Sequence, residues 1–290
     1  MTILDWIVLA IFLITCLGIG LWAGRGQKDS ADYFLGKRNL PWWAVSFSVV
    51  ATETSVLTFI GIPAIAYATN LQFLQLTIGY VLGRYLVARF LIPAYFSGNI
   101  STTYEFLGQR FDANLRRLSS LVFVVTRILA DGVRLFATAI PLKLMTGISY
   151  PDAILLIGII TIIYTLAGGI RSVVWMDVMQ LGIYIGGAVI ALVILIPDSV
   201  GFAELLETDK LQIFAFSGGG YTLVLSVLGG MFLSMASHGT DHLMVQRLLA
   251  CKSEKESKKA LVVSGWIVMA QFALFLVIGA FLWLKFYDLF

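Results

Sequence analysis

The sequence is built from apolar segments that are long enough to cross a lipid bilayer as helices. A spanning helix needs about 20 consecutive apolar residues, and eight segments of this kind follow one another along the chain. Hydrophobic residues make up 59% of the 290 residues and charged residues only 13%, with a mean hydropathy of +0.90. Because soluble domains carry about 25% charged residues, we predict an all-α polytopic membrane protein that resides in a lipid bilayer.

The predicted spans lie at about residues 3–23, 42–69, 71–97, 117–147, 151–168, 172–197, 222–250 and 260–285. The first span lacks the basic flank and the small-residue cleavage pattern of a signal peptide, so we interpret it as a retained helix. Two short amphipathic segments, 102–111 and 201–211, are predicted to lie at the membrane surface. No linker divides the chain, which we predict to be a single transmembrane domain over residues 1–290.

Lysines and arginines gather in alternate loops, and this asymmetry predicts the orientation in the membrane. One set of loops contains Arg25, Lys28, Lys37, Arg38, Arg110, Arg116, Arg117, Arg171, Lys252, Lys255, Lys258 and Lys259. The opposite loops contain essentially Lys210 and Lys285. Since positively charged loops stay in the cytoplasm, we predict a multi-pass protein of the cell membrane (plasma or inner) with its N-terminus outside. The basic residues are spread over short loops, so no nucleic-acid partner is expected.

The second span contains a run of polar residues that is costly inside hydrocarbon. Residues 51–55 read Ala-Thr-Glu-Thr-Ser, Thr58 follows, and Gly61 and Pro63 come shortly after. An ionisable side chain there costs about 2.5–3.5 kcal/mol on insertion scales. One interpretation is an interrupted helix whose freed carbonyl oxygens bind a hard cation, as in many transporters. The other is a proline kink with the hydroxyls bonded to the preceding turn, and composition does not decide between them.

The fourth span carries three charged residues on one helical face. Arg127, Asp131 and Arg134 are spaced by four and three positions, which brings their side chains together. We favour an ion-pair stripe between packed helices, and the alternative is an arginine that binds a substrate carboxylate bidentately. Asp131 can neutralise only one of the two arginines, so the other needs a further partner.

Two later groups of ionisable residues also fall within the predicted spans. Asp177 lies six residues beyond Arg171, about 9 Å along the helix, and is either an ion ligand or an interfacial acid paired with a base. The trio His238, Asp241 and His242 has the spacing of residues on one helical face. It lacks further acids or cysteines, so we expect it to line a permeation path rather than to bind zinc.

Five segments carry a resemblance to a known family. They are DYFLGKRNLPWW (32–43), ATETSVLTFIGIP (51–63), TTYEFLGQRF (102–111), YTLAGGIRSVVWMDVMQ (164–180) and GTDHLMVQRLLACKSEKESKKAL (239–261). In this order they resemble signatures of the sodium:solute symporter family, and the resemblance covers nearly all of the chain. It implies a leucine-transporter-type inverted-repeat fold, preceded by the extra helix 3–23. The first five-helix repeat would occupy 42–197 and the start of the second 222–285, so we expect a truncated, N-terminal portion of a transporter.

The resemblance also implies the positions of the ion ligands. The family's sodium site uses backbone carbonyls at positions that match Ala51 and Thr54, together with hydroxyls on a later helix. Asp177 matches a family aspartate on the sodium exit path that serves a second ion site in some members. No other metal and no cofactor is expected.

Substrate residues are implied less uniformly. Glu53, Ser55 and Thr58 match positions that line the substrate cavity in some members, and Arg127 or Arg134 could hold an anionic group. Thr77 falls where sugar-transporting members place a carboxylate, and Val268 replaces their lysine, which weakens a sugar substrate. Glu53 would repel an anion unless it were protonated or paired.

We therefore predict sodium-coupled secondary active symport of a small polar organic solute by alternating access. One alternative is the symporter-like membrane domain of a sensor or receptor protein, and another is a 290-residue chain that acts alone as a binding or scaffold protein. An enzyme is not expected, because no nucleophile–base–orienter set is present.

Overall fold

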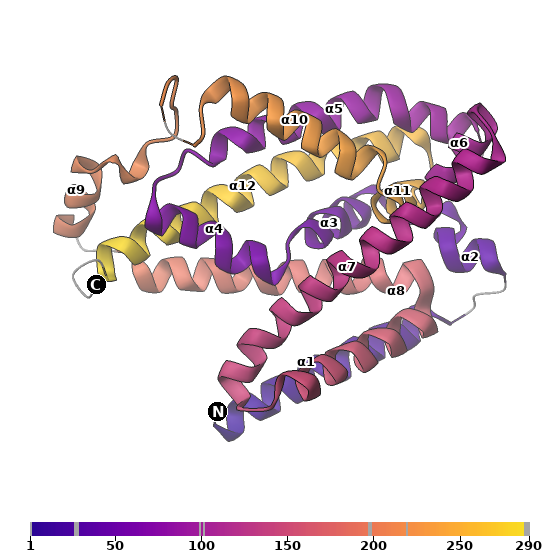
Figure 1. The fold of residues 1–290 in the computed structure, drawn as a ribbon. Coiled ribbons are helices and arrows are strands. Elements are labelled where there is room, and N and C mark those ends of the chain that lie inside the picture. Colours follow the sequence, from indigo (N-terminus) through magenta and orange to yellow (C-terminus); the bar gives the residue numbers. More distant parts are fainter. Residues whose placement is uncertain are drawn as a thin grey trace.

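The computed structural model describes residues 2–25, 29–98, 100, 102–196, 199–218 and 220–286, and its elements are helices packed side by side (Figure 1). Lys28, noted above among the basic residues, lies outside the described residues. The elements are α1 (Ile3–Ala23), α2 (Ser30–Leu35), η1 (Gly36–Arg38), α3 (Trp42–Glu53), α4 (Val56–Ala68), α5 (Leu74–Ser97), α6 (Thr103–Arg110), α7 (Ala113–Thr146), α8 (Tyr150–Leu195), α9 (Ser199–Glu207), η2 (Asp209–Leu211), α10 (Leu223–Gly239), α11 (His242–Leu249) and α12 (Glu254–Phe286).

The helices have the length and composition of membrane spans. Four of them qualify individually within the described residues, and up to six spans result if each of two sharply bent pairs counts as one. α8 contributes one of these spans, although it covers two of the spans predicted from the sequence. α7 is 34 residues long but is not among the helices that qualify. Each of the eight predicted segments is therefore occupied by helix.

α8 turns back on itself at Gly169, where the predicted spans 151–168 and 172–197 meet. Gly169 has φ 54° and ψ −153°, a conformation that favours glycine because it has no Cβ. The first half of α8 runs beside α1, and the second half runs beneath α3 and α4 (Figure 1). At Gly24 the approach is so close that a Cβ would overlap the Ala167 carbonyl oxygen.

The second predicted span is interrupted, as one of its two interpretations required. α3 ends at Glu53, α4 begins at Val56, and the two axes differ by 67°. Thr54 and Ser55 are extended, with φ/ψ of −87°/95° and −99°/174°. The expectation that Pro63 causes the interruption is wrong, because Pro63 lies inside α4, which continues past it.

The seventh predicted span, 222–250, is also interrupted, which was not anticipated from the sequence. α10 ends at Gly239 and α11 begins at His242, with a bend of 65° between them. Asp241 caps the new helix, since its Oδ1 accepts a hydrogen bond from the Leu243 amide at 2.8 Å. Carboxylates are favoured at this position because the first amides of a helix lack backbone acceptors. The described residues thus contain two spans that are broken in this way.

The two broken helices pack against α5 and α12. α10 lies along α5, and α12 contacts α3, α4 and α5 (Figure 1). Glycines permit the α5–α10 approach, since a Cβ on Gly79 would overlap the Val227 carbonyl oxygen and one on Gly230 that of Leu76. Small residues at helix crossings allow this close packing in membranes.

The end of the bundle that holds α2 and α11 joins segments distant in sequence. Leu40, just before α3, donates its amide to the carbonyl of Ala250, just after α11, at 3.1 Å. Asp32 on α2 is 1% exposed and forms ion pairs with Lys37 at 3.2 Å and Arg171 at 3.4 Å. At the opposite end, the Lys210 Nζ of η2 donates to the Tyr67 carbonyl in the last turn of α4 at 2.7 Å.

Candidate functional site

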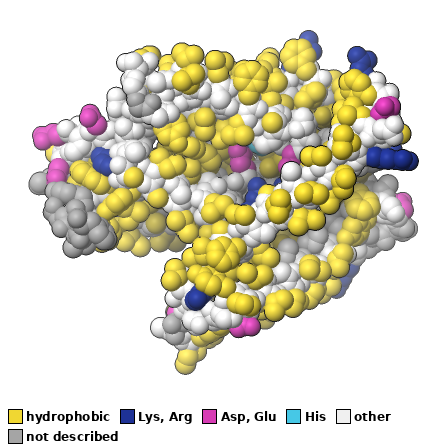
Figure 2. Space-filling model, viewed as in Figure 1, with side chains coloured by type: hydrophobic (Ala, Val, Ile, Leu, Met, Phe, Trp, Pro, Cys, Tyr) yellow, Lys and Arg dark blue, Asp and Glu magenta, His cyan; other side chains and the backbone are white. Residues whose placement is uncertain are grey.

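A cavity of about 210 Å³ lies where the two breaks come together with α5 and α7. Its lining is a mixture of charged, polar and apolar side chains: Thr52, Glu53, Tyr80, Arg127, Arg134, Leu233, Ser237, His238, Asp241, Leu243 and Met244. Figure 2 shows acidic and basic side chains together between α7 and the helices above it, with hydrophobic side chains around them. We call this space the central cavity.

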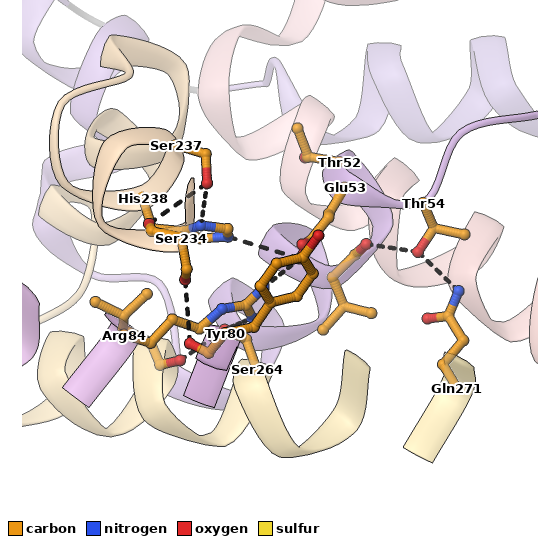
Figure 3. Close-up of polar contacts among 12 residues, drawn as sticks. Thr52, Glu53, Thr54, Tyr80, Arg84, Ser234, Ser237, His238, Ser264 and Gln271 are labelled. Atoms are coloured by element: carbon orange, nitrogen blue, oxygen red, sulfur yellow. Dashed lines mark hydrogen bonds and ion pairs between the residues drawn. The ribbon is translucent and has the colours of Figure 1, made fainter. Parts of the chain in front are cut away.

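Glu53, at the end of α3, is paired with an arginine that is completely buried. Arg84 of α5 donates Nη2 to Glu53 Oε2 and Nη1 to Ser264 Oγ of α12, the latter at 2.7 Å (Figure 3). The Arg84 side chain is 0% exposed, whereas that of Glu53 is 19% exposed. This ion pair explains how a carboxylate is tolerated in the middle of a predicted membrane span, since a buried charge needs a hydrogen-bonded partner. Sequence reasoning missed Arg84, although an arginine inside the apolar segment 71–97 is a recognisable signal.

His238 of α10 completes the group around Glu53. Its Nε2 lies 3.7 Å from Glu53 Oε2, and its Nδ1 lies 2.8 Å from Ser237 Oγ (Figure 3). Within the described residues, no group of three or more His, Cys, Asp or Glu side chains is arranged to hold a metal ion. Of the trio His238, Asp241 and His242, the first two line the central cavity.

The charged stripe on α7 forms the opposite wall. Asp131 Oδ2 lies 2.9 Å from Arg127 Nε, and Asp131 Oδ1 lies 3.6 Å from Arg134 Nη1. The further partner that the stripe required is Asp241, whose Oδ2 lies 3.5 Å from Arg127 Nη1. The α7 stripe is therefore joined electrostatically to the break between α10 and α11.

The break between α3 and α4 leaves backbone oxygens without their usual helical partners. The Thr54 amide donates to Val50 O at 3.0 Å and Ala51 O at 3.1 Å, and the Thr54 hydroxyl donates to Val50 O at 2.8 Å. Gln271 of α12 donates its side-chain amide to Thr54 Oγ1 at 2.8 Å (Figure 3). Among the described residues no backbone amide donates to the Thr54 carbonyl oxygen, because Thr58 N–H is directed to the Ser55 side chain.

Asp177, on the second half of α8, lies against α3 and α11. Its Oδ2 accepts from Ser48 Oγ at 2.5 Å and from Arg247 Nη2 at 3.2 Å, with Thr52 Oγ1 at 3.5 Å. Arg247 Nε also donates to Ser48 Oγ at 2.9 Å. Asp177 is thus paired with a neighbouring base, and Arg247 was not anticipated.

The remaining residues implied by the resemblance do not gather in the central cavity. Ser55 lines a second, mostly apolar cavity of about 680 Å³ between α1, α4, α7 and α8. The Thr58 hydroxyl donates to Glu53 O at 3.3 Å, within the break. Thr77 is fully buried on α5, with its hydroxyl donating to Leu74 O at 2.7 Å. Of the implied substrate residues, the structure brings together Glu53, Arg127 and Arg134.

Comparison with known proteins identifies the family and the fold. The pattern of the sodium:solute symporter family matches residues 33–286. The chain belongs to the sodium:solute symporter family. A solved structure of a substrate-bound, outward-open Na⁺-coupled sialic acid symporter superimposes with a TM-score of 0.88 at 30% identity, covering 99% of this chain and 62% of that one. The predicted leucine-transporter-type fold is confirmed.

Members of the family with different substrates are similar to the chain. The human sodium/iodide cotransporter is 31% identical over 95% of this chain and 44% of its own length. The sodium/sialic acid symporter NanT of Aliivibrio fischeri is 31% identical over 96% of this chain and 56% of its own. The sodium-coupled monocarboxylate transporter 1 of Xenopus laevis is 29% identical over 93% and 45%. The chain spans about half the length of the curated relatives it matches.

Proposed function

We propose that the intact protein is a sodium-coupled symporter of a small polar organic solute that works by alternating access. The observation that carries the proposal is the break at Thr54 and Ser55, which is adjacent to Glu53 on the wall of a charged central cavity. Broken helices of this kind place ion and substrate sites side by side near the middle of the bilayer. The relatives named above are sodium-coupled transporters, which supports transport rather than catalysis.

For the sodium ion we propose the carbonyl oxygens of Ala51 and Thr54 as ligands, with Asp177 at an exit or second ion position. Hard cations prefer oxygen ligands. Among the described residues the Thr54 carbonyl has no amide partner, and the Ala51 carbonyl accepts from the Thr54 amide, which it shares with the Val50 carbonyl. Asp177 is engaged by Arg247, so a cation at Asp177 would have to compete with this guanidinium. No cofactor takes part in the proposed cycle.

Coupling follows if sodium and solute stabilise the same conformation. A ligand shifts a conformational equilibrium only by its difference in affinity for the two states, and two ligands that favour one state raise each other's affinity. Entry of one positive charge through 100 mV contributes about 2.3 kcal/mol. Sodium binding at the break would therefore form the outward-facing cavity and supply the driving force.

We place the protein in the plasma or inner membrane with its N-terminus outside. The apolar helices support a bilayer location, since many large hydrophobic side chains on α1, α7 and α8 are exposed on the surface of the bundle. The basic loops at the end that holds α2 and α11 support a cytoplasmic position for this end.

The test is uptake by the intact protein in proteoliposomes, with an inward sodium gradient compared with an equal potassium gradient. We expect solute accumulation only with sodium, and a higher sodium requirement for Asp177→Asn than for Lys258→Gln, which removes a charge at the start of α12. Accumulation that is the same with and without sodium would overturn the proposal.

A further inference from the structure

We propose that the transported solute is a zwitterion of amino-acid size, bound with its carboxylate toward Arg127 and Arg134 and its cationic group toward Glu53. This inference rests on the proposed function and adds the substrate class. It is carried by the charges, exposure and volume of the central cavity.

The central cavity and the residues paired with its lining are balanced in formal charge, apart from His238. Three guanidinium groups, on Arg84, Arg127 and Arg134, face three carboxylates, on Glu53, Asp131 and Asp241. Each arginine already has an acidic partner within these pairs. A zwitterion adds no net charge to this low-dielectric space, where unbalanced charges are least tolerated. A monoanion would rely on the sodium ion at the neighbouring break for its neutralisation, whereas each charge of a zwitterion meets an opposite charge on the cavity wall itself.

Glu53 provides an acceptor for a cationic group. Arg84 binds Glu53 at Oε2, and His238 approaches the same oxygen at 3.7 Å. No described residue donates a hydrogen bond to Glu53 Oε1, and the side chain is 19% exposed at the cavity wall. Because Arg84 holds the carboxylate at Oε2, the other oxygen, Oε1, is positioned to accept a hydrogen bond from a cationic group of the solute. Hydrogen bonds of this charge-assisted kind are among the strongest.

The opposite wall provides donors for a carboxylate. The Arg134 side chain is 44% exposed, and its contact with Asp131 is 3.6 Å, longer than a normal hydrogen bond. Arg127 is held at two points by Asp131 and Asp241 and is 20% exposed. A planar guanidinium that keeps free N–H groups binds carboxylates bidentately. Arg134 is therefore the arginine most able to receive the solute.

Volume and apolar lining limit the rest of the molecule. The central cavity measures about 210 Å³, whereas pockets for drug-sized ligands measure about 300–1,000 Å³. Leu233, Leu243 and Met244 add an apolar surface between the charged walls. This combination fits an amino acid or a betaine with a short apolar body. The relatives named above transport iodide, monocarboxylates and sialic acid, so the inferred class differs from theirs in charge.

The test uses the intact protein in proteoliposomes with a sodium gradient. The panel consists of the common amino acids, glycine betaine, lactate, choline and glycerol, each radiolabelled. We expect sodium-dependent accumulation of at least one net-neutral zwitterion, at least tenfold above lactate and choline. Accumulation of lactate but of no zwitterion would overturn the substrate class and leave symport standing. Failure of every class to accumulate with sodium would count against both proposals.

Two variants make the role of Glu53 testable. Glu53→Gln leaves Arg84 without its acid, so the cavity gains one positive charge, and we expect the zwitterion-to-lactate uptake ratio to fall at least tenfold. If this variant does not fold, Glu53→Gln combined with Arg84→Gln restores the balance. In the double variant we expect the zwitterion KM to rise at least tenfold, without gain of lactate uptake. An unchanged ratio in the folded single variant, or an unchanged KM in the double variant, would refute the assignment.

Discussion

The buried Glu53–Arg84 pair leads to a quantitative prediction about stability. The two side chains come from different helices, and the structure surrounds them unequally: Arg84 is 0% exposed, whereas Glu53 is 19% exposed at the central cavity. Removing Glu53 strands a guanidinium that has no access to water. Removing Arg84 leaves a carboxylate that still reaches the cavity. We therefore expect Glu53→Gln to destabilise the protein more than Arg84→Gln does.

The expected magnitudes follow from measured behaviour of buried ion pairs. Loss of one partner costs about 3–5 kcal/mol because the other charge is left uncompensated, whereas replacement of both by hydrophobic residues of similar volume is often neutral. Two glutamines likewise leave no buried charge uncompensated. At about 2–4 °C per kcal/mol for chains somewhat shorter than this one, Glu53→Gln should lower Tm by about 6–20 °C. The double variant Glu53→Gln/Arg84→Gln should recover most of this loss. The exposed pair Lys258–Glu254 should contribute at most about 1 kcal/mol.

The assay is a thermal scan of the purified protein in detergent, in which unfolding is monitored by the intrinsic fluorescence of its 7 tryptophans. All variants are heated at one rate, because unfolding that is irreversible gives a rate-dependent Tm. Lys258→Gln, at the start of α12, is the matched control for loss of a cation–carboxylate pair. If the double variant melts as low as Glu53→Gln, the two residues act independently and the explanation by a stranded charge is wrong.

Three further predictions test packing, burial and the break. Gly230→Ala should lower stability by about 1–3 kcal/mol, because the new Cβ would overlap the backbone of α5. Gly229→Ala is the control, since a Cβ at Gly229 would have no neighbour within 4 Å, and equal Tm values for the two variants would contradict the packing. Burial raises the pKa of the Cys251 thiol to about 12, and the residue is 0% exposed, so little reactive thiolate exists at pH 7. Mass spectrometry should therefore find maleimide on Cys251 only after unfolding, and rapid labelling of the native protein would refute this. Gln271→Leu removes the hydrogen bond to the Thr54 hydroxyl at the break, which is worth about 1 kcal/mol. The sodium concentration for half-maximal uptake should therefore rise about fivefold, and an unchanged concentration would exclude a role of Gln271 in holding the break.

Periodicity and composition predicted the helices better than they predicted the contacts. Length and hydropathy located the spans, and the polar run at residues 51–55 indicated an interruption because hydroxyls and a carboxylate are unfavourable in a continuous lipid-embedded helix. The break at residues 240–241 lies in the polar run Ser-His-Gly-Thr-Asp-His (237–242), which we interpreted as the lining of a permeation path and not as an interruption. A proline is the usual cause of a helix break, yet here the Pro63 helix continues.

The partners of the charged residues could not be predicted from spacing. Arg84 and Glu53 are 31 residues apart, Arg84 and Ser264 are 180 apart, and Arg247 is 70 residues from Asp177. Such pairs are determined by which helix faces meet in three dimensions. The α7 stripe could be foreseen because its residues share one helical face, whereas its attachment to Asp241 depends on the second break.

The join between α3 and α11 restricts how the bundle can change shape. Both are short halves of broken helices, and they are linked by the bond from Leu40 N to Ala250 O and by Arg247, which contacts Ser48 on α3. Of their other halves, α10 packs along α5, and α4 packs on α12, which also contacts α3. We therefore expect a rotation at either break to move α3 and α11 together, and Asp177 on α8, which contacts Ser48 on α3 and Arg247 on α11, to oppose that rotation.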